Sequence, residues 1–170
     1  MQILKAATKD IPQIVDLLNS GYRGETSKKG WTSEADLLDG EVRTDENTIS
    51  KLMDNPHAVF LKYIDQNNEL QGCVFLEKKN EKLYLGMLCV SPFIQAQGIG
   101  RQLMNAATSH AKEQNCHSIF MKVISVRKEL IAWYERQGYN PTAVTEPFPS
   151  DERFGRPTQS LEFMIMEKTL

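Results

Sequence analysis

The sequence lacks any apolar run approaching the roughly 20 residues that a membrane span needs. Residues 1–5 lack the apolar core of a secretory signal peptide. A long basic run is also missing, and the net charge is only −2. We therefore expect neither nucleic acid nor a membrane as a partner, and we expect a cytoplasmic protein.

Cysteine is scarce, and the three residues Cys73, Cys89 and Cys116 form no CxxC pair. Cys73 and Cys89 lie in strand-like runs, where a thiol packs as a small hydrophobic group. This pattern predicts a reducing compartment and no disulfide framework. The three histidines show no metal-ligand spacing with cysteines or acids, so no metal site is expected.

The 170 residues, of which 41% are hydrophobic, suffice for one domain with a sizeable core over residues 1–170. Hydrophobic periodicity and breaker residues predict elements in the order β-α-α-α-β-β-β-α-β-α-β-β. The strands are expected near 3–6, 57–64, 70–78, 82–90, 118–124, 139–144 and 161–166, and the helices near 11–22, 33–38, 45–53, 99–115 and 127–137.

Short polar turns join the strands near 57–64, 70–78 and 82–90, so these strands are expected to pair antiparallel. The next strand follows a helix, and such a crossover places it parallel to the strand near 82–90. Pro141 limits its strand to a sheet edge or a bulge. The fold class is therefore α/β, with a mixed sheet of about seven strands flanked by helices.

A strand near 83–90 leads into Gln95-Ala96-Gln97-Gly98-Ile99-Gly100 and then into a helix. The first turn of a helix has free backbone N–H groups and a positive dipole end, so this loop is a predicted anion site. A dinucleotide fingerprint would need glycine at Leu103, and a Walker A loop would need Lys-Ser/Thr after Gly100. Both nucleotide patterns therefore fail on spacing.

The Gln-x-x-Gly-x-Gly loop resembles the Arg/Gln-x-x-Gly-x-Gly/Ala pyrophosphate loop of the GNAT N-acetyltransferase superfamily. The segment 133–139, WYERQGY, resembles the Tyr-Glu-x-x-Gly-Phe/Tyr segment of the same family. The order of elements matches the family over essentially the whole chain. The resemblance implies a GNAT-like sheet and acetyl-CoA as co-substrate, with no metal.

Further site residues follow from that resemblance. Backbone groups of the loop are expected on the pyrophosphate, and the strand before it on pantetheine. The implied coenzyme-binding residues are Leu88, Cys89, Val90, Gln95, Ala96, Gln97, Gly98, Ile99, Gly100 and Arg101. Tyr134 is implied as the acid that protonates the leaving thiolate. Cys89 lacks an identifiable basic partner, which argues against an acyl-enzyme.

The acceptor pocket is expected to use Tyr22, Arg23, Trp31 and Glu34, together with Phe148, Arg153 and Phe154 from a late loop. Arginine there would suit a carboxylate on the acceptor. Glu34 is a candidate for the amine site or the base, and equally for a charge in a first helical turn. Tyr84 stands where related histone-type enzymes carry a glutamate base, and Arg127 lies near a position where many members carry Asn, so the base stays unassigned.

Two functions from different classes remain open. The first is an N-acetyltransferase that moves an acetyl group from acetyl-CoA to a primary amine of a small molecule or peptide. The second is a non-catalytic acyl-CoA-binding or sensor domain. Many members of the family dimerise through late strands, so a homodimer is a further expectation.

Overall fold

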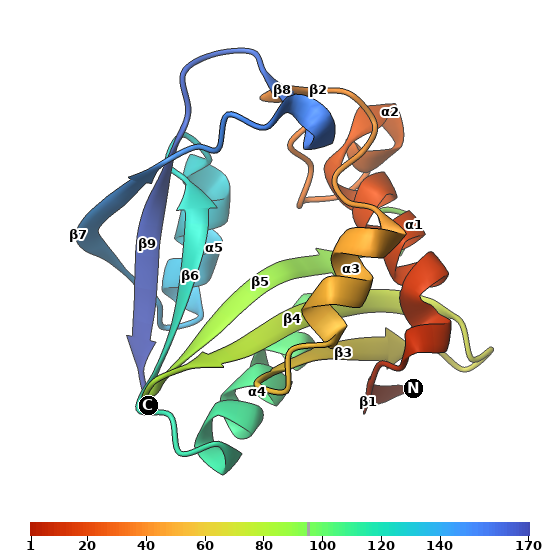
Figure 1. Cartoon of the computed structure of the whole chain (residues 1–170), viewed down its shortest axis with the longest axis vertical. Helices are drawn as coiled ribbons and strands as arrows, with labels where there is room; N and C mark the ends of the chain where they lie inside the picture. Colours follow the sequence, from red (N-terminus) through yellow and green to blue (C-terminus); the bar gives the residue numbers. More distant parts are fainter. Residues whose placement is uncertain (95) are drawn as a thin grey trace.

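A seven-stranded mixed sheet runs through the computed structural model in the order β1-β3-β4-β5-β6-β9-β7 (Figure 1). The structure describes residues 1–94 and 96–170. The sheet strands are β1 (Gln2–Lys5), β3 (Ala58–Ile64), β4 (Leu70–Lys79), β5 (Lys82–Val90), β6 (Ser118–Ile124), β7 (Asn140–Pro147) and β9 (Glu162–Thr169). The short strands β2 (Leu38–Asp39) and β8 (Arg156–Pro157) pair with each other. The helices are α1 (Ile11–Tyr22), α2 (Gly24–Ser27), α3 (Glu46–Met53), α4 (Ile99–Glu113) and α5 (Lys128–Arg136), with 3-10 turns η1 (Thr8–Asp10) and η2 (Glu152–Phe154).

The strand pairing confirms the predicted α/β fold and its topology. β3, β4 and β5 form an antiparallel meander, and β6 lies parallel to β5. Pro141 lies in the edge strand β7, whose register with β9 is irregular after it. This placement suits a residue that has no backbone N–H to donate.

The prediction of a short helix near 33–38 is wrong. The Ser33 hydroxyl contacts Ser27 Oγ at 2.6 Å and accepts from the Ala35 N–H at 3.2 Å, which holds a turn rather than a helix. Leu38 then enters β2 opposite Pro157 and is 1% exposed. Pairing with a distant segment therefore overrides the local capping signal.

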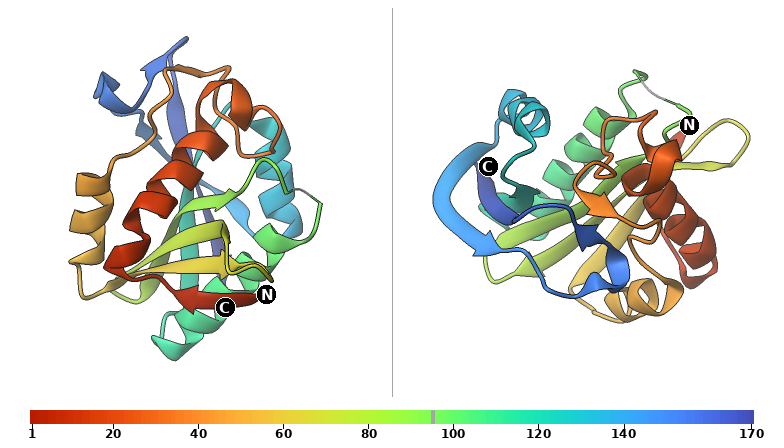
Figure 2. Two further views of the ribbon diagram at one scale, coloured as in Figure 1. Left: turned by 90° about the vertical axis from the view of Figure 1, so that its right-hand side faces the viewer. Right: turned by 90° about the horizontal axis from the view of Figure 1, so that it is seen from above.

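Helices cover both faces of the sheet (Figure 2). α1 packs on β4 and β5 from one face, where Ile14 and Leu18 are fully buried. α4 packs on the same two strands from the other face, with Leu103 fully buried in a core cluster that also includes Ile119. The helical spacing of these apolar residues explains why each helix lies with one side on the sheet.

A bulge in β5 opens the sheet. Cys73 pairs with Cys89 and Phe75 with Gly86, so β5 has one residue more than β4 in this interval. Met87 lies in this interval and has a positive φ of 52°. Such a bulge bends its strand and increases the local twist. β5 and β6 pair only over Lys82–Tyr84 and Ser118–Phe120, and beyond these pairs the two strands diverge (Figure 1).

Asp10 anchors the start of α1 and supplies a pH-dependent prediction. Its side chain accepts from the Ala7 N–H at 2.7 Å and from Lys62 Nζ at 2.9 Å. Burial raises the pKa of this carboxyl, but these two partners outweigh it and hold the pKa below the ordinary value. The ionised carboxylate therefore stabilises the fold above about pH 3.9, and this contribution is lost as the pH falls through the folded-state pKa.

We expect Asp10→Asn to lower the free energy of unfolding by about 1–2 kcal/mol at neutral pH. The difference in the free energy of unfolding between the parent protein and Asp10→Asn should decrease as the pH falls from about 5 to about 3. Urea unfolding at several pH values measures it. Asp54→Asn, at an exposed carboxylate, is the control and should change little at any pH. A gap for Asp10→Asn that stays constant with pH would contradict this account.

Within the described ranges, no helix has the length and apolar content of a transmembrane span. The same residues include no group of three or more His, Cys, Asp or Glu side chains that could hold a metal ion.

Candidate active site

The predicted anion site opens on a cavity of about 1040 Å³. Residues 96–101 form one wall of this cavity, and the loop around Trp31 and the start of α5 form others. We call it the coenzyme cavity after the ligand predicted for this loop. Gly98 is the N-cap residue of α4 with a φ of 73°, and Ala96 also has a positive φ. This backbone directs the first N–H groups of a 15-residue helix toward the cavity, where an anion is favoured.

Close packing explains the second glycine of the loop. A Cβ at Gly100 would lie 3.0 Å from Trp31 Cζ2, so the helix start approaches the indole closely. Trp31 in turn contacts Trp133, with ring centroids 4.6 Å apart. Trp31, predicted as an acceptor residue, therefore lines the coenzyme cavity instead.

Cationic side chains surround the same cavity. Arg101, Lys128 and Arg136 are exposed residues of its lining, and no described carboxylate lies within 4.0 Å of their charged groups. Together with the positive end of α4, they favour a polyanionic ligand.

A second cavity of about 390 Å³ lies at the divergence of β5 and β6. Tyr22, Arg23 and Glu34, three predicted acceptor residues, line this cavity, as do Phe148 and Phe154. We call it the acceptor cavity after that prediction. Arg153 does not line it, and forms an exposed ion pair with Asp151 at 2.7 Å. Glu34, Arg127 and Leu130 line both cavities, so the two meet at these side chains.

An ion triad of Arg23, Glu34 and Arg127 stands at that meeting point. One Glu34 oxygen pairs with Arg23 and the other lies 3.5 Å from Arg127 Nη1. Arg23 also donates to the Phe154 carbonyl at 2.8 Å, which ties the late loop to α1. Burial lowers the pKa of Arg23, and Glu34 opposes that shift. Both Glu34 oxygens face arginines, and these ion pairs hold the carboxylate in place between Arg23 and Arg127.

Tyr134 lies on the acceptor side, 7% exposed, with its ring against Trp133 and Tyr139. Among the described residues none forms a hydrogen bond with its hydroxyl. Burial raises the pKa of Tyr134, so the phenol is protonated at neutral pH. The hydroxyl is thus available as a proton donor to a ligand.

The strand predicted to contact pantetheine divides between the two cavities. Val90 lines the coenzyme cavity and Leu88 the acceptor cavity, and the Leu88 carbonyl accepts a hydrogen bond from Tyr22 Oη. Cys89 is fully buried, with Sγ 3.6 Å from the Leu17 carbonyl. Burial raises the pKa of its thiol to about 12, which is incompatible with a thiolate nucleophile at neutral pH. Gln95 lies outside the described residues.

Comparison with known proteins decides the family. The family model described as "Acetyltransferase (GNAT) family" matches residues 12–139. The chain belongs to the GNAT acetyltransferase family. Sequence search among curated proteins found no significant match.

Solved structures share the GNAT fold at low sequence identity. Ribosomal-protein-alanine N-acetyltransferase from Brucella melitensis is 17% identical with a TM-score of 0.73, and the match covers 100% of each chain. The ribosomal-protein-S18-alanine N-acetyltransferase from Escherichia coli is 17% identical with a TM-score of 0.72, covering 99% of this chain and 92% of that one. A GNAT family acetyltransferase from Staphylococcus aureus Mu50 is 17% identical with a TM-score of 0.70, covering 99% and 98%. At this identity the likeness shows the fold alone.

The sequence analysis did not identify two site residues of this GNAT chain. Arg127 completes the ion triad with Glu34 and Arg23, whereas the sequence indicated only that it lies near a position where many family members carry Asn. Arg43 lines the acceptor cavity from a loop with no motif around it. Neither long-range contact has a periodic or spaced signal along the chain.

Proposed function

We propose that this GNAT protein transfers an acetyl group from acetyl-CoA to the primary amine of an acceptor. The observation that carries the proposal is the meeting of two cavities at Glu34, Arg127 and Leu130, one of which lies at the divergence of β5 and β6. One has a helix N-terminus and cations for a polyanion, and the other has a protonated tyrosine without a hydrogen-bond partner in the described chain.

In this proposal the coenzyme pyrophosphate lies against the backbone of residues 97–101. Pantetheine follows the part of β5 that β6 leaves unpaired, where backbone groups around Val90 are available. Cys89 contributes backbone only, because its side chain is buried away from both cavities.

The reaction is direct attack in the acceptor cavity. The lone pair of a neutral amine forms a C–N bond to the thioester carbonyl carbon, and the C–S bond then breaks. The departing thiolate takes the Tyr134 proton, and the acetylated nitrogen releases one proton, which restores the phenol through water. The products are an amide and free coenzyme A, so no external reductant or oxidant is required.

Water is the proposed initial proton acceptor for the amine. Of the described residues that line the acceptor cavity, only Glu34 and Asp151 are carboxylates, and each faces arginine. Tyr84, at the position of the family's glutamate, has a pKa raised by burial, which keeps it neutral.

Release of free thiol from acetyl-CoA in the presence of a panel of primary amines tests the proposal. We expect at least one amine to increase thiol release above the amine-free rate. A protein that binds acetyl-CoA and releases no thiol with any amine would instead be the non-catalytic acyl-CoA-binding domain.

A further inference from the structure

One arginine of the acceptor cavity differs from the others in its pairing. Arg43 is half-buried in the loop before α3, and its guanidinium carbon lies 5.5 Å from the centroid of the Tyr22 ring. Among the described residues, no carboxylate lies within 4.0 Å of it. By contrast, Glu34 pairs with both Arg23 and Arg127.

The Arg43 backbone is held in place by α1. Asn19 Oδ1 accepts from the N–H groups of Arg43 at 2.6 Å and Thr44 at 3.0 Å, and Asn19 Nδ2 donates to the Thr44 carbonyl at 3.2 Å. This clamp fixes the base of the side chain. A guanidinium held in a cavity offers two parallel donors to a planar anion.

The net charge of the acceptor cavity also favours an anionic ligand. Its described lining includes four cationic side chains and two carboxylates. The cations are Arg23, Arg43, Lys122 and Arg127, and the carboxylates are Glu34 and Asp151. Lys122 pairs with Glu146 at 2.8 Å and Asp151 with Arg153 at 2.7 Å, so the excess positive charge lies on Arg43 and on the triad of Arg23, Glu34 and Arg127. Of the four cations in the described lining, Arg43 is the one without a carboxylate partner. A lining with this net positive charge favours an anionic group on the acceptor.

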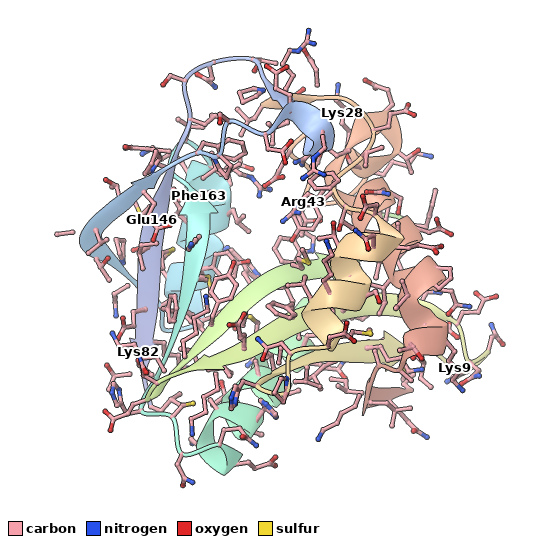
Figure 3. All side chains as sticks on the ribbon, viewed as in Figure 1. Lys9, Lys28, Arg43, Lys82, Glu146 and Phe163 are labelled. Carbon is pink, nitrogen blue, oxygen red and sulfur yellow. The ribbon has the colours of Figure 1, made fainter. Side chains whose placement is uncertain are left out.

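The opposite wall is aromatic. Phe148 and Phe163 contact each other with ring centroids 5.1 Å apart, and Phe154 lines the same cavity. Figure 3 shows Arg43 on the side of α1 and α3, with Phe163 on the side of β6 and β9. A volume of about 390 Å³ suits a small molecule rather than a folded partner.

We infer that the acceptor is a small primary amine that carries a carboxylate and an apolar group, as an apolar amino acid does. The carboxylate binds Arg43, the apolar group packs on the phenylalanine wall, and the amine faces the thioester. This inference rests on the proposed acetyl transfer and adds the class of acceptor.

The test compares matched acceptors by thiol release from acetyl-CoA. The probes are L-phenylalanine, L-leucine and L-methionine, each beside its amide and its decarboxylated amine. We expect kcat/KM to be about 10- to 100-fold higher for at least one amino acid than for its two carboxylate-free partners. Arg43→Gln should remove this preference and leave kcat/KM for the carboxylate-free amine within about threefold. Lys51→Gln, which removes an exposed cation of α3, is the control and should retain the preference.

A second readout is independent of turnover. Calorimetric titration of the N-acetyl amino acid and the N-acetyl amine should show the same preference for the carboxylate, lost in Arg43→Gln. Thiol release that depends neither on the carboxylate nor on Arg43 would overturn the acceptor class and leave acetyl transfer standing. Binding of acetyl-CoA without thiol release from any probe or panel amine would overturn the proposed function, and the acceptor class with it.

Discussion

Tyr134→Phe should lower kcat by about 100-fold, since it removes the proton donor for the leaving thiolate. The hydroxyl makes no hydrogen bond to described residues, so its removal should leave the fold intact. Stopped-flow or steady-state thiol release gives kcat, and titration calorimetry gives the acetyl-CoA affinity. We expect the affinity to stay within about threefold, because the phenol acts on the sulfur only in the transition state.

Tyr139→Phe is the matched control for this variant. Tyr139 is also a buried tyrosine, with its ring centroid 6.2 Å from that of Tyr134, but it lines neither cavity. Its kcat should equal that of the parent protein. Equal turnover in Tyr134→Phe, with any active acceptor, would remove Tyr134 from the mechanism.

Glu34→Gln should have the largest effect on stability. The substitution leaves Arg23, whose side chain is 3% exposed, without its carboxylate, and it also unpairs Arg127. Removing one partner of a buried ion pair costs about 3 kcal/mol. For a chain of this length the expected fall in Tm is about 6–12 °C. Scanning calorimetry measures both quantities.

Glu25→Gln provides the surface comparison. Glu25 also pairs with a cation, Lys28, but its side chain is 89% exposed. An exposed pair of this kind contributes less than about 1 kcal/mol, so its Tm should hardly change. A Tm for Glu34→Gln that matches that of Glu25→Gln would contradict the structural role of the triad.

Local sequence patterns predicted most of the fold. The apolar spacing of α1 and α4, the glycine loop between β5 and α4, and the proline that confines β7 to an edge are all short-range signals. The strand–helix–strand crossover then followed from handedness. The predicted helix near 33–38 is wrong because Leu38 pairs with Pro157, more than a hundred residues away, and no local pattern records that partner.

The candidate site was also predictable only where local motifs mark its residues. The loop 96–101 and Tyr134 carry local motifs that map onto the two cavities. Trp31 was predicted at the acceptor but lies on the coenzyme cavity, because it packs on Trp133 and Gly100. Glu34 lies at the centre of an ion triad, which the sequence did not indicate. Arg43 lines the cavity because Asn19 holds the loop that carries it. No sequence pattern links these two residues, so this contact could not be predicted.

The measurement that tests the central claim most directly is thermal unfolding with acetyl-CoA, using ATP and NAD as controls. At about 100 times Kd, binding adds roughly 2.7 kcal/mol, or a Tm increase of about 5–10 °C. Gly98→Asp and Gly98→Asn form a matched pair, because a Cβ at Gly98 meets no atom within 4 Å and both residues tolerate its positive φ. The account predicts a shift with acetyl-CoA alone, retained in the Asn variant and lost in the Asp variant, whose charge opposes the phosphates. No shift at millimolar acetyl-CoA, or an equal shift in both variants, would contradict a coenzyme site at the start of α4.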